Sequence, residues 1–171
     1  KEIFEWIKVF ALAIVFAFII TQFIKPTLVR GDSMYSTLEE GDYLIINRMS
    51  YKFKEPERGD IIVFESDLKQ DDGSSKDLVK RVIGVGGDKV KIENNKVYVN
   101  DEELNEPYIH NEITEGDIDT VVPDGAVFVL GDNREISLDS RYDSVGFISK
   151  SDILGKVFVR LYPFNKIGLL D

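Results

Sequence analysis

Apolar residues follow two different patterns along the chain, and the first of them occupies its N-terminal end. Residues 9–24 form an uncharged run with only two polar members. A helix of this length covers about 24 Å at ~1.5 Å per residue, and Trp6 and Lys8 at its start extend it towards the ~30 Å of a bilayer core. Because Pro26 ends such a helix, we expect a single-pass membrane anchor over residues 1–26.

A buried core helix and a cleavable signal peptide are the alternative interpretations of this run. A core helix is disfavoured because the run is apolar on every face rather than along one stripe. A signal peptide is disfavoured because the following segment, "KPTLVRG", is bulky and basic and holds no small-x-small cleavage site. The flanking charges, Lys1 and Lys8 before the run and Lys25 and Arg30 after it, are too evenly balanced to set its orientation.

After the anchor, apolar residues fall in short runs of the kind typical of β-strands. These runs cover residues 42–48, 60–64, 78–85, 126–132 and 155–163. They predict a mainly β fold, in which a mostly antiparallel sheet forms the domain over residues 27–171.

Three further segments complete this prediction. Residues 89–99 alternate between apolar and polar around Asn94-Asn95, a pair that favours a tight hairpin turn. Residues 66–77 are polar throughout and predict a loop. Residues 149–154 predict one short helix, with Ser149 as its N-cap.

Glycine followed by aspartate recurs at residues 41, 59, 87, 116 and 131. Glycine supplies the positive φ that many turns need, and an aspartate side chain accepts hydrogen bonds from nearby backbone. We therefore expect turns at the first four pairs.

Composition narrows the function classes. The 171 residues suffice for one domain beside the anchor, with 43% apolar residues to build a core. The absence of cysteine excludes disulfides and thiolate metal sites. A formal net charge of -10 argues against nucleic acid as a partner, because its backbone is itself anionic.

Candidate chemistry begins with a serine and a lysine. Ser33 lies in "GDSMYSTL" just after the anchor, where a serine is ordinarily a turn residue. Lys80 lies in "LVKRVIGV", and in a strand it shares a face with Leu78 and Val82. Such neighbours desolvate the amine and lower its pKa from ~10.4, so that it can act as a neutral general base. A solvent-facing lysine is the ordinary alternative.

A dense cluster of charges and hydroxyls forms the third candidate segment, "GDNREISLDSR" at residues 131–141. It is either an exposed charged loop or a set of side chains that orients a base and fixes the loop by ion pairs. His110 is the one histidine and could serve a Ser-His-Asp arrangement, but its polar, acidic surroundings favour a surface residue.

These three segments, in this order after a membrane segment, resemble the type I signal peptidases of bacteria, and the compact domain is similar to their Gram-positive branch. The resemblance carries over nearly the whole chain through "GDSMYSTL", "KRVIGVGGD" and "GDNREISLDSR". It implies a membrane-bound serine endopeptidase that removes signal peptides from exported preproteins, cutting after small residues in an Ala-x-Ala-like pattern. It also implies a catalytic domain on the extracytoplasmic side, preproteins and membrane lipid as partners, and no metal or organic cofactor.

The resemblance also assigns roles to residues. Ser33 would be the nucleophile and its backbone N–H an oxyanion donor, while Lys80 would be the general base and Ser137 would hold its ammonium. Met34 would line the apolar cleft. The supporting salt-bridge network would comprise Arg81, Asp132, Asp139 and Arg141.

Three positions depart from the family pattern. Ser36 and Gly86 stand where the family usually has proline, which loosens both segments. Gly31 stands where some relatives have a serine that adds an oxyanion donor. These departures leave an inactive scaffold as one alternative. A self-cleaving Ser-Lys regulator is another, although it calls for a helix-turn-helix that this chain replaces with a membrane segment.

Overall fold

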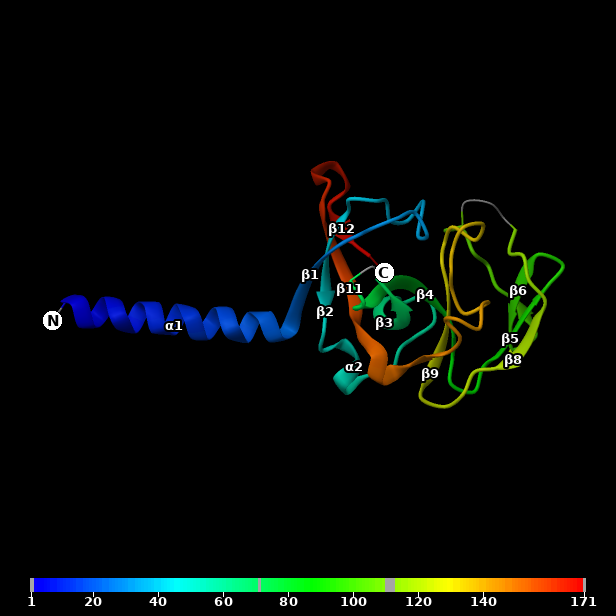
Figure 1. Ribbon diagram of the computed structural model, residues 1–171, viewed down its shortest axis with the longest axis horizontal. Coiled ribbons are helices and arrows are strands. Elements are labelled where there is room, and N and C mark those ends of the chain that lie inside the picture. Colours follow the sequence, from blue (N-terminus) through cyan, green and yellow to red (C-terminus); the bar gives the residue numbers. More distant parts are fainter. Residues whose placement is uncertain (1, 71, 110–112, 171) are drawn as a thin grey trace.

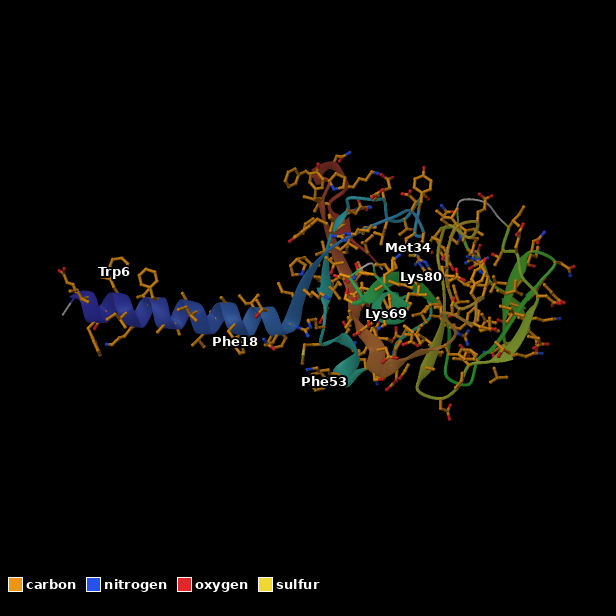
Figure 2. All side chains as sticks on the ribbon, viewed as in Figure 1. Trp6, Phe18, Met34, Phe53, Lys69 and Lys80 are labelled. Carbon is orange, nitrogen blue, oxygen red and sulfur yellow. The ribbon has the colours of Figure 1, made fainter. Side chains whose placement is uncertain are left out.

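A computed structural model describes residues 2–70, 72–109 and 113–170. Helix α1 (Glu2–Phe23) extends alone from one side of a β-rich domain, as Figure 1 shows. Its mean hydropathy is 2.4 over its most apolar window, and none of that window is buried against the rest of the chain. Trp6 and Phe18 project from the helix without a packing partner in the domain (Figure 2). This confirms the expected N-terminal helix of membrane-spanning length.

His110, the alternative candidate base, lies outside the described residues.

All strand pairs in the domain are antiparallel, which confirms the predicted fold class. The larger sheet has the order β1-β2-β11-β3-β4-β9-β10, with β12 paired to β11. Its strands are β1 (Ile24–Leu28), β2 (Tyr43–Asn47), β3 (Ile61–Lys69), β4 (Ser75–Val85), β9 (Ala126–Leu130), β10 (Ile148–Ser149), β11 (Ile153–Tyr162) and β12 (Gly168–Leu169).

The smaller sheet lies at the end of the domain far from α1, as Figure 1 shows. Its order is β7-β6-β5-β8. Its strands are β5 (Lys89–Glu93), β6 (Lys96–Val99), β7 (Glu102–Glu103) and β8 (Ile118–Val121). The described residues also include three short helices: α2 (Ser50–Phe53), η1 (Lys150–Asp152) and η2 (Phe164–Lys166).

Three of the Gly-Asp pairs form the same turn. Gly41, Gly59 and Gly87 have φ of 88°, 93° and 88°. In each turn the aspartate side chain accepts a hydrogen bond from the backbone N–H three residues earlier, at 2.9–3.1 Å. Each aspartate also binds a cation from a distant segment, and the pairs are Asp42–Arg160, Asp60–Lys156 and Asp88–Arg58. The predicted turn chemistry is confirmed for these three pairs, and each turn is also tied to a distant part of the fold. The fourth expected turn, at Gly116, is not formed, because residues 113–117 are irregular and lead directly into β8.

The hairpin predicted at Asn94-Asn95 is confirmed. Both residues have positive φ, 50° and 65°, and Glu93 pairs directly with Lys96 across the two-residue turn. The loop predicted over residues 66–77 is too long, because β3 and β4 continue into it as a hairpin in which Ser66 pairs with Lys76. The connection between the two strands is confined to the segment between Lys69 and Ser75. The outer half of this hairpin is largely exposed on both faces, so the alternation that signals a strand is missing from its sequence.

The helix predicted over residues 149–154 is only partly confirmed. Ser149 does cap a helix, since its side chain accepts a hydrogen bond from the Ser151 N–H, but the helix is a single 3₁₀ turn, η1. Ile153 already pairs with Phe64 of β3. Ile153 closes the 3₁₀ turn through its N–H, which donates to the Lys150 carbonyl, and the chain continues from there as strand β11. Helix propensity is therefore overridden by strand pairing.

Candidate active site

The segment that carries Ser33, residues 29–38, is fastened to the core by its apolar members and is called the nucleophile loop below. Met34 and Leu38 are almost fully buried in one core cluster together with Val29. The Leu38 N–H donates to the Met34 carbonyl at 2.8 Å, which closes a turn. These contacts fix the loop on the sheet and leave Ser33 half-buried at its surface. Pro26 precedes the loop in β1, an edge strand, where its missing N–H costs no sheet hydrogen bond.

Ser33 and Lys80 are brought together by the fold. Lys80 Nζ lies 2.6 Å from Ser33 Oγ, within hydrogen-bond distance, although the residues are 47 positions apart. Lys80 is held in β4 opposite Ile62 of β3, and only 2% of it is exposed. Figure 2 shows Lys80 in the interior of the domain, in the same region as Met34 of the nucleophile loop. A serine and an amine at this distance form the pair that proton transfer requires.

Burial lowers the pKa of Lys80 from its ordinary value of 10.5 to about 8. The cause is loss of hydration of the ammonium in the interior of the sheet. The charge of Asp139 opposes this effect and raises the pKa, so that it is not lowered further. A substantial fraction of the Lys80 amine is therefore neutral near pH 8 and can accept a proton.

Residues 131–141, called the charged loop below, hold the nucleophile loop against the end of β9. The Asn133 N–H donates to the Ser33 carbonyl at 3.1 Å, and Asn133 Nδ2 donates to the Asp32 carbonyl at the same distance. A Cβ at Gly131 would collide with the Ser33 carbonyl and with the Ser137 side chain. Glycine is needed here because the two loops approach each other so closely.

Two buried bidentate ion pairs stiffen the charged loop. Arg81 donates to both carboxylate oxygens of Asp132, at 2.9 and 2.7 Å, and Arg141 does the same with Asp139, at 2.8 and 3.1 Å. Asp139 also accepts from the Gly131 N–H at 3.1 Å. The four predicted supporting charges thus lie together as two pairs, and the carboxylate of each pair is fully buried.

Ser137 is buried beside Gly131, and its hydroxyl has no hydrogen-bond partner among the residues that the structure describes. The expected contact between Ser137 and Lys80 is therefore not formed in this arrangement of side chains. The stabilisation of a Lys80 ammonium by Ser137 stays a prediction.

The three departures from the family pattern have different structural settings. Gly31 has φ of +80°, a conformation that strains any other L-residue, so its backbone disfavours a serine donor here. A Cβ at Gly86 would lie 3.1–3.3 Å from backbone atoms of residues 123–125, so this glycine admits a close turn. Ser36 is exposed in the nucleophile loop.

Several residues near the site have contacts that the sequence does not predict. Thr37 Oγ1 donates to Asp132 at 2.5 Å, and Arg134 is buried against Glu106 and Thr114. The Tyr108 ring lies 4.0 Å from the Arg81 guanidinium carbon. The charge density of the charged loop was a signal for Arg134. The other contacts join segments far apart in sequence and carry no local signal.

A cleft of about 520 Å³ opens beside Ser33 and Lys80. One wall is formed by residues 27–34 and the other by residues 75–80 of β4, while Ile136 and Leu138 come from the charged loop. Within the described residues, β1 pairs only with β2, and residues 75–80 of β4 pair only with β3. Each wall therefore includes a strand edge, at residues 27–28 of β1 and at residues 75–80 of β4. Lys25 of β1, just before the first wall, forms an ion pair with Asp77 of the second at 3.1 Å.

Comparison with known proteins gives consistent matches. The family model described as signal peptidase, peptidase S26, matches residues 3–162. Signal peptidase IB of Staphylococcus aureus (strain COL) is 40% identical over 185 aligned positions, which cover 97% of this chain and 93% of that protein. Signal peptidase I of Bacillus licheniformis is 36% identical over 182 positions, covering 100% and 95%.

Among solved structures, a signal peptidase I from Enterococcus faecalis V583 matches with 33% identity and a TM-score of 0.49. That match covers 60% of this chain and 97% of the other. The family model spans almost the whole chain, and the two relatives are similar to it over nearly their full lengths. The chain belongs to the signal peptidase family, peptidase S26.

Proposed function

We propose that Ser33 and Lys80 are the nucleophile and general base of this chain, a membrane-anchored serine endopeptidase that removes signal peptides from preproteins. The observation that carries the residue assignment is the 2.6 Å distance between a buried lysine amine and a serine hydroxyl beside an open cleft. Both dyad residues are present, so the inactive-scaffold alternative has no support from the site.

The dyad can carry both halves of peptide hydrolysis. Neutral Lys80 accepts the hydroxyl proton as Ser33 Oγ attacks the scissile carbonyl, and the resulting ammonium gives that proton to the leaving amine. An ester between Ser33 and the signal peptide remains. Lys80, neutral again, then accepts a proton from a water molecule as that water attacks the ester. The Lys80 ammonium returns this proton to Ser33 Oγ as the bond between Oγ and the acyl carbon breaks, and the signal peptide leaves with a free carboxyl group.

The Ser33 backbone N–H is the proposed donor to the oxyanion of each tetrahedral intermediate. Gly31 offers no side-chain donor, and its positive φ disfavours one. The dyad therefore depends on backbone donors and on the rigid position of the nucleophile loop.

The cleft suits an extended peptide. A substrate strand lying between residues 27–34 and residues 75–80 finds backbone hydrogen-bonding groups on both sides. Met34, Ile136 and Leu138 supply apolar lining near the dyad. We propose that the pockets on this lining are shallow, so that they admit alanine-sized side chains and exclude larger ones, which produces cleavage after an Ala-x-Ala-like sequence.

The test of this function is cleavage of a preprotein by the full chain in detergent, with the cut site mapped by mass spectrometry. We expect one cut, directly after a small-x-small sequence at the end of the signal peptide. Replacing the small residue before the cut by a bulky one such as leucine should abolish it. Absence of cleavage, or cuts that ignore this residue, would contradict the proposal.

We also propose that residues 27–171 form the catalytic domain and that it lies on the extracytoplasmic side, against the lipid surface. Aromatic side chains are strongly exposed on two short helices of the domain, Phe53 of α2 at 84% and Phe164 of η2 at 78%. Figures 1 and 2 show α2 and Phe53 at the end of the domain near the anchor. Such side chains favour a membrane interface.

Protease added to intact bacterial protoplasts tests this orientation. A domain on the extracytoplasmic side should be digested while a cytoplasmic marker protein remains whole. Protection of the domain until the cells are lysed would place it on the cytoplasmic side and contradict the proposal.

A further inference from the structure

Thr37 is the residue whose side chain joins the nucleophile loop to the buried Arg81–Asp132 pair. Its Oγ1 donates to Asp132 Oδ2 at 2.5 Å, and Arg81 Nη2 lies 3.5 Å from the same hydroxyl. The contact spans 95 positions of the sequence. It is made to a carboxylate that is fully buried, so water does not compete for that oxygen.

The backbone of Thr37 is also fixed. Its carbonyl accepts from Arg160 Nη1 at 3.1 Å, and the same nitrogen binds Asp42 at 2.8 Å. Arg160 lies in β11, near the middle of the larger sheet. The C-terminal end of the nucleophile loop is therefore held by two charged side chains from two different strands, Arg81 through Asp132 and Arg160 directly.

These contacts connect Ser33 and Lys80 to the same short segment, Asp132 and Asn133 of the charged loop. Lys80 is the residue before Arg81 in β4, and Arg81 is bound to Asp132 by two hydrogen bonds. Ser33 is bound through its carbonyl to Asn133, the residue after Asp132. Thr37 lies four residues after Ser33 in the nucleophile loop, and its hydroxyl binds Asp132 as well. The loop is therefore attached to residues 132–133 both at Ser33 and at Thr37.

We propose that Thr37 is a positioning residue, whose hydroxyl acts through Asp132 and Arg81 to keep Ser33 Oγ within hydrogen-bond distance of Lys80 Nζ. The inference rests on the proposed function of Ser33 and Lys80. Its physical basis is that a small displacement of a nucleophile lowers the rate strongly, by up to about 100-fold for about 1 Å. Asp132 keeps both hydrogen bonds from Arg81 when Thr37 changes, so the buried ion pair survives.

The test compares Thr37→Val, which keeps the shape and removes the hydroxyl, with Thr37→Ser, which keeps the hydroxyl. We expect Thr37→Val to lower kcat about 10- to 100-fold with KM changed less than about twofold. Thr37→Ser should stay within about threefold of the wild type. Thr120→Val in β8 of the smaller sheet is the matched control and should behave as the wild type. Thr37→Ala, which cannot clash, is measured beside Thr37→Val.

Thermal unfolding separates positioning from simple stabilisation. If Thr37→Val and Thr37→Ala lower Tm but keep the wild-type kcat per folded molecule, Thr37 is only structural and the inference is overturned. A rise in KM with unchanged kcat also overturns it, since substrate binding would then be the property affected. Neither result would contradict the assignment of Ser33 and Lys80 as the dyad, because that assignment is tested separately by the activity of Ser33→Ala.

Discussion

Ser33→Ala is expected to lower kcat/KM for a preprotein by at least about four orders of magnitude, because it removes the oxygen that forms the acyl intermediate. Lys80→Met should cause a loss of similar size, since it removes the amine that lies 2.6 Å from the Ser33 hydroxyl. Losses of members of one catalytic unit are not additive. The double variant should therefore be no slower than either single variant.

Matched controls make this result specific. Ser36→Ala removes a hydroxyl from the same loop, and Lys69→Met removes an exposed amine from β3; both should keep activity within about tenfold of the wild type. Figure 2 shows Lys69 apart from the anchor, on the hairpin of β3 and β4. Retained turnover in Ser33→Ala or in Lys80→Met would refute the dyad.

Stability gives an independent check on Lys80→Met. A pKa lowered from 10.5 to about 8 means that the buried ammonium destabilises the folded domain by about 3 kcal/mol at pH 6. The folded state binds fewer protons than the unfolded state between pH 8 and 10.5, so this penalty disappears as the pH rises through that window. Lys80→Met should therefore be more stable than the wild type at pH 6, with the difference shrinking above pH 8.

The second large effect is the pH dependence of kcat/KM. Only the neutral amine of Lys80 accepts the Ser33 proton, and its pKa of about 8 leaves about 1% of the amine neutral at pH 6. We expect kcat/KM to rise about tenfold per pH unit below pH 7.5 and to reach a plateau above pH 9. Initial rates with one preprotein across this range measure it.

A histidine or carboxylate base would give a different curve. Activity would then be constant from about pH 7.5 upwards, and such a plateau would contradict a lysine base. Thr37→Val should lower the plateau, since its proposed effect is on the geometry of the dyad.

Local chemistry explains what the sequence predicts well. The Asn94-Asn95 turn and the turns at Gly41, Gly59 and Gly87 depend on residues that are neighbours in the chain. The long apolar run of α1 likewise needs no tertiary information. For such elements, backbone preference and side-chain period determine the structure, so they are visible before any fold is known.

Contacts between distant segments could not be predicted in the same way. Motifs nominate Ser33 and Lys80, but their 2.6 Å separation depends on the register of β3, β4 and β9. The sequence around Thr37 gives no sign of a special role, because its hydrogen bond to Asp132 forms only when the fold brings the two residues together. The outer part of the β3–β4 hairpin was missed because its strands are exposed on both faces.

The central claim is that burial keeps the Lys80 amine largely neutral at pH values where an ordinary lysine is charged. NMR titration of the full chain in detergent, with ¹³C-labelled lysine, tests it directly, and the Lys80 signal is assigned by its loss in Lys80→Met. The account predicts a Lys80 signal that titrates near pH 8, well below the 10.5 of an ordinary lysine. A Lys80 signal that titrates near 10.5 would contradict it.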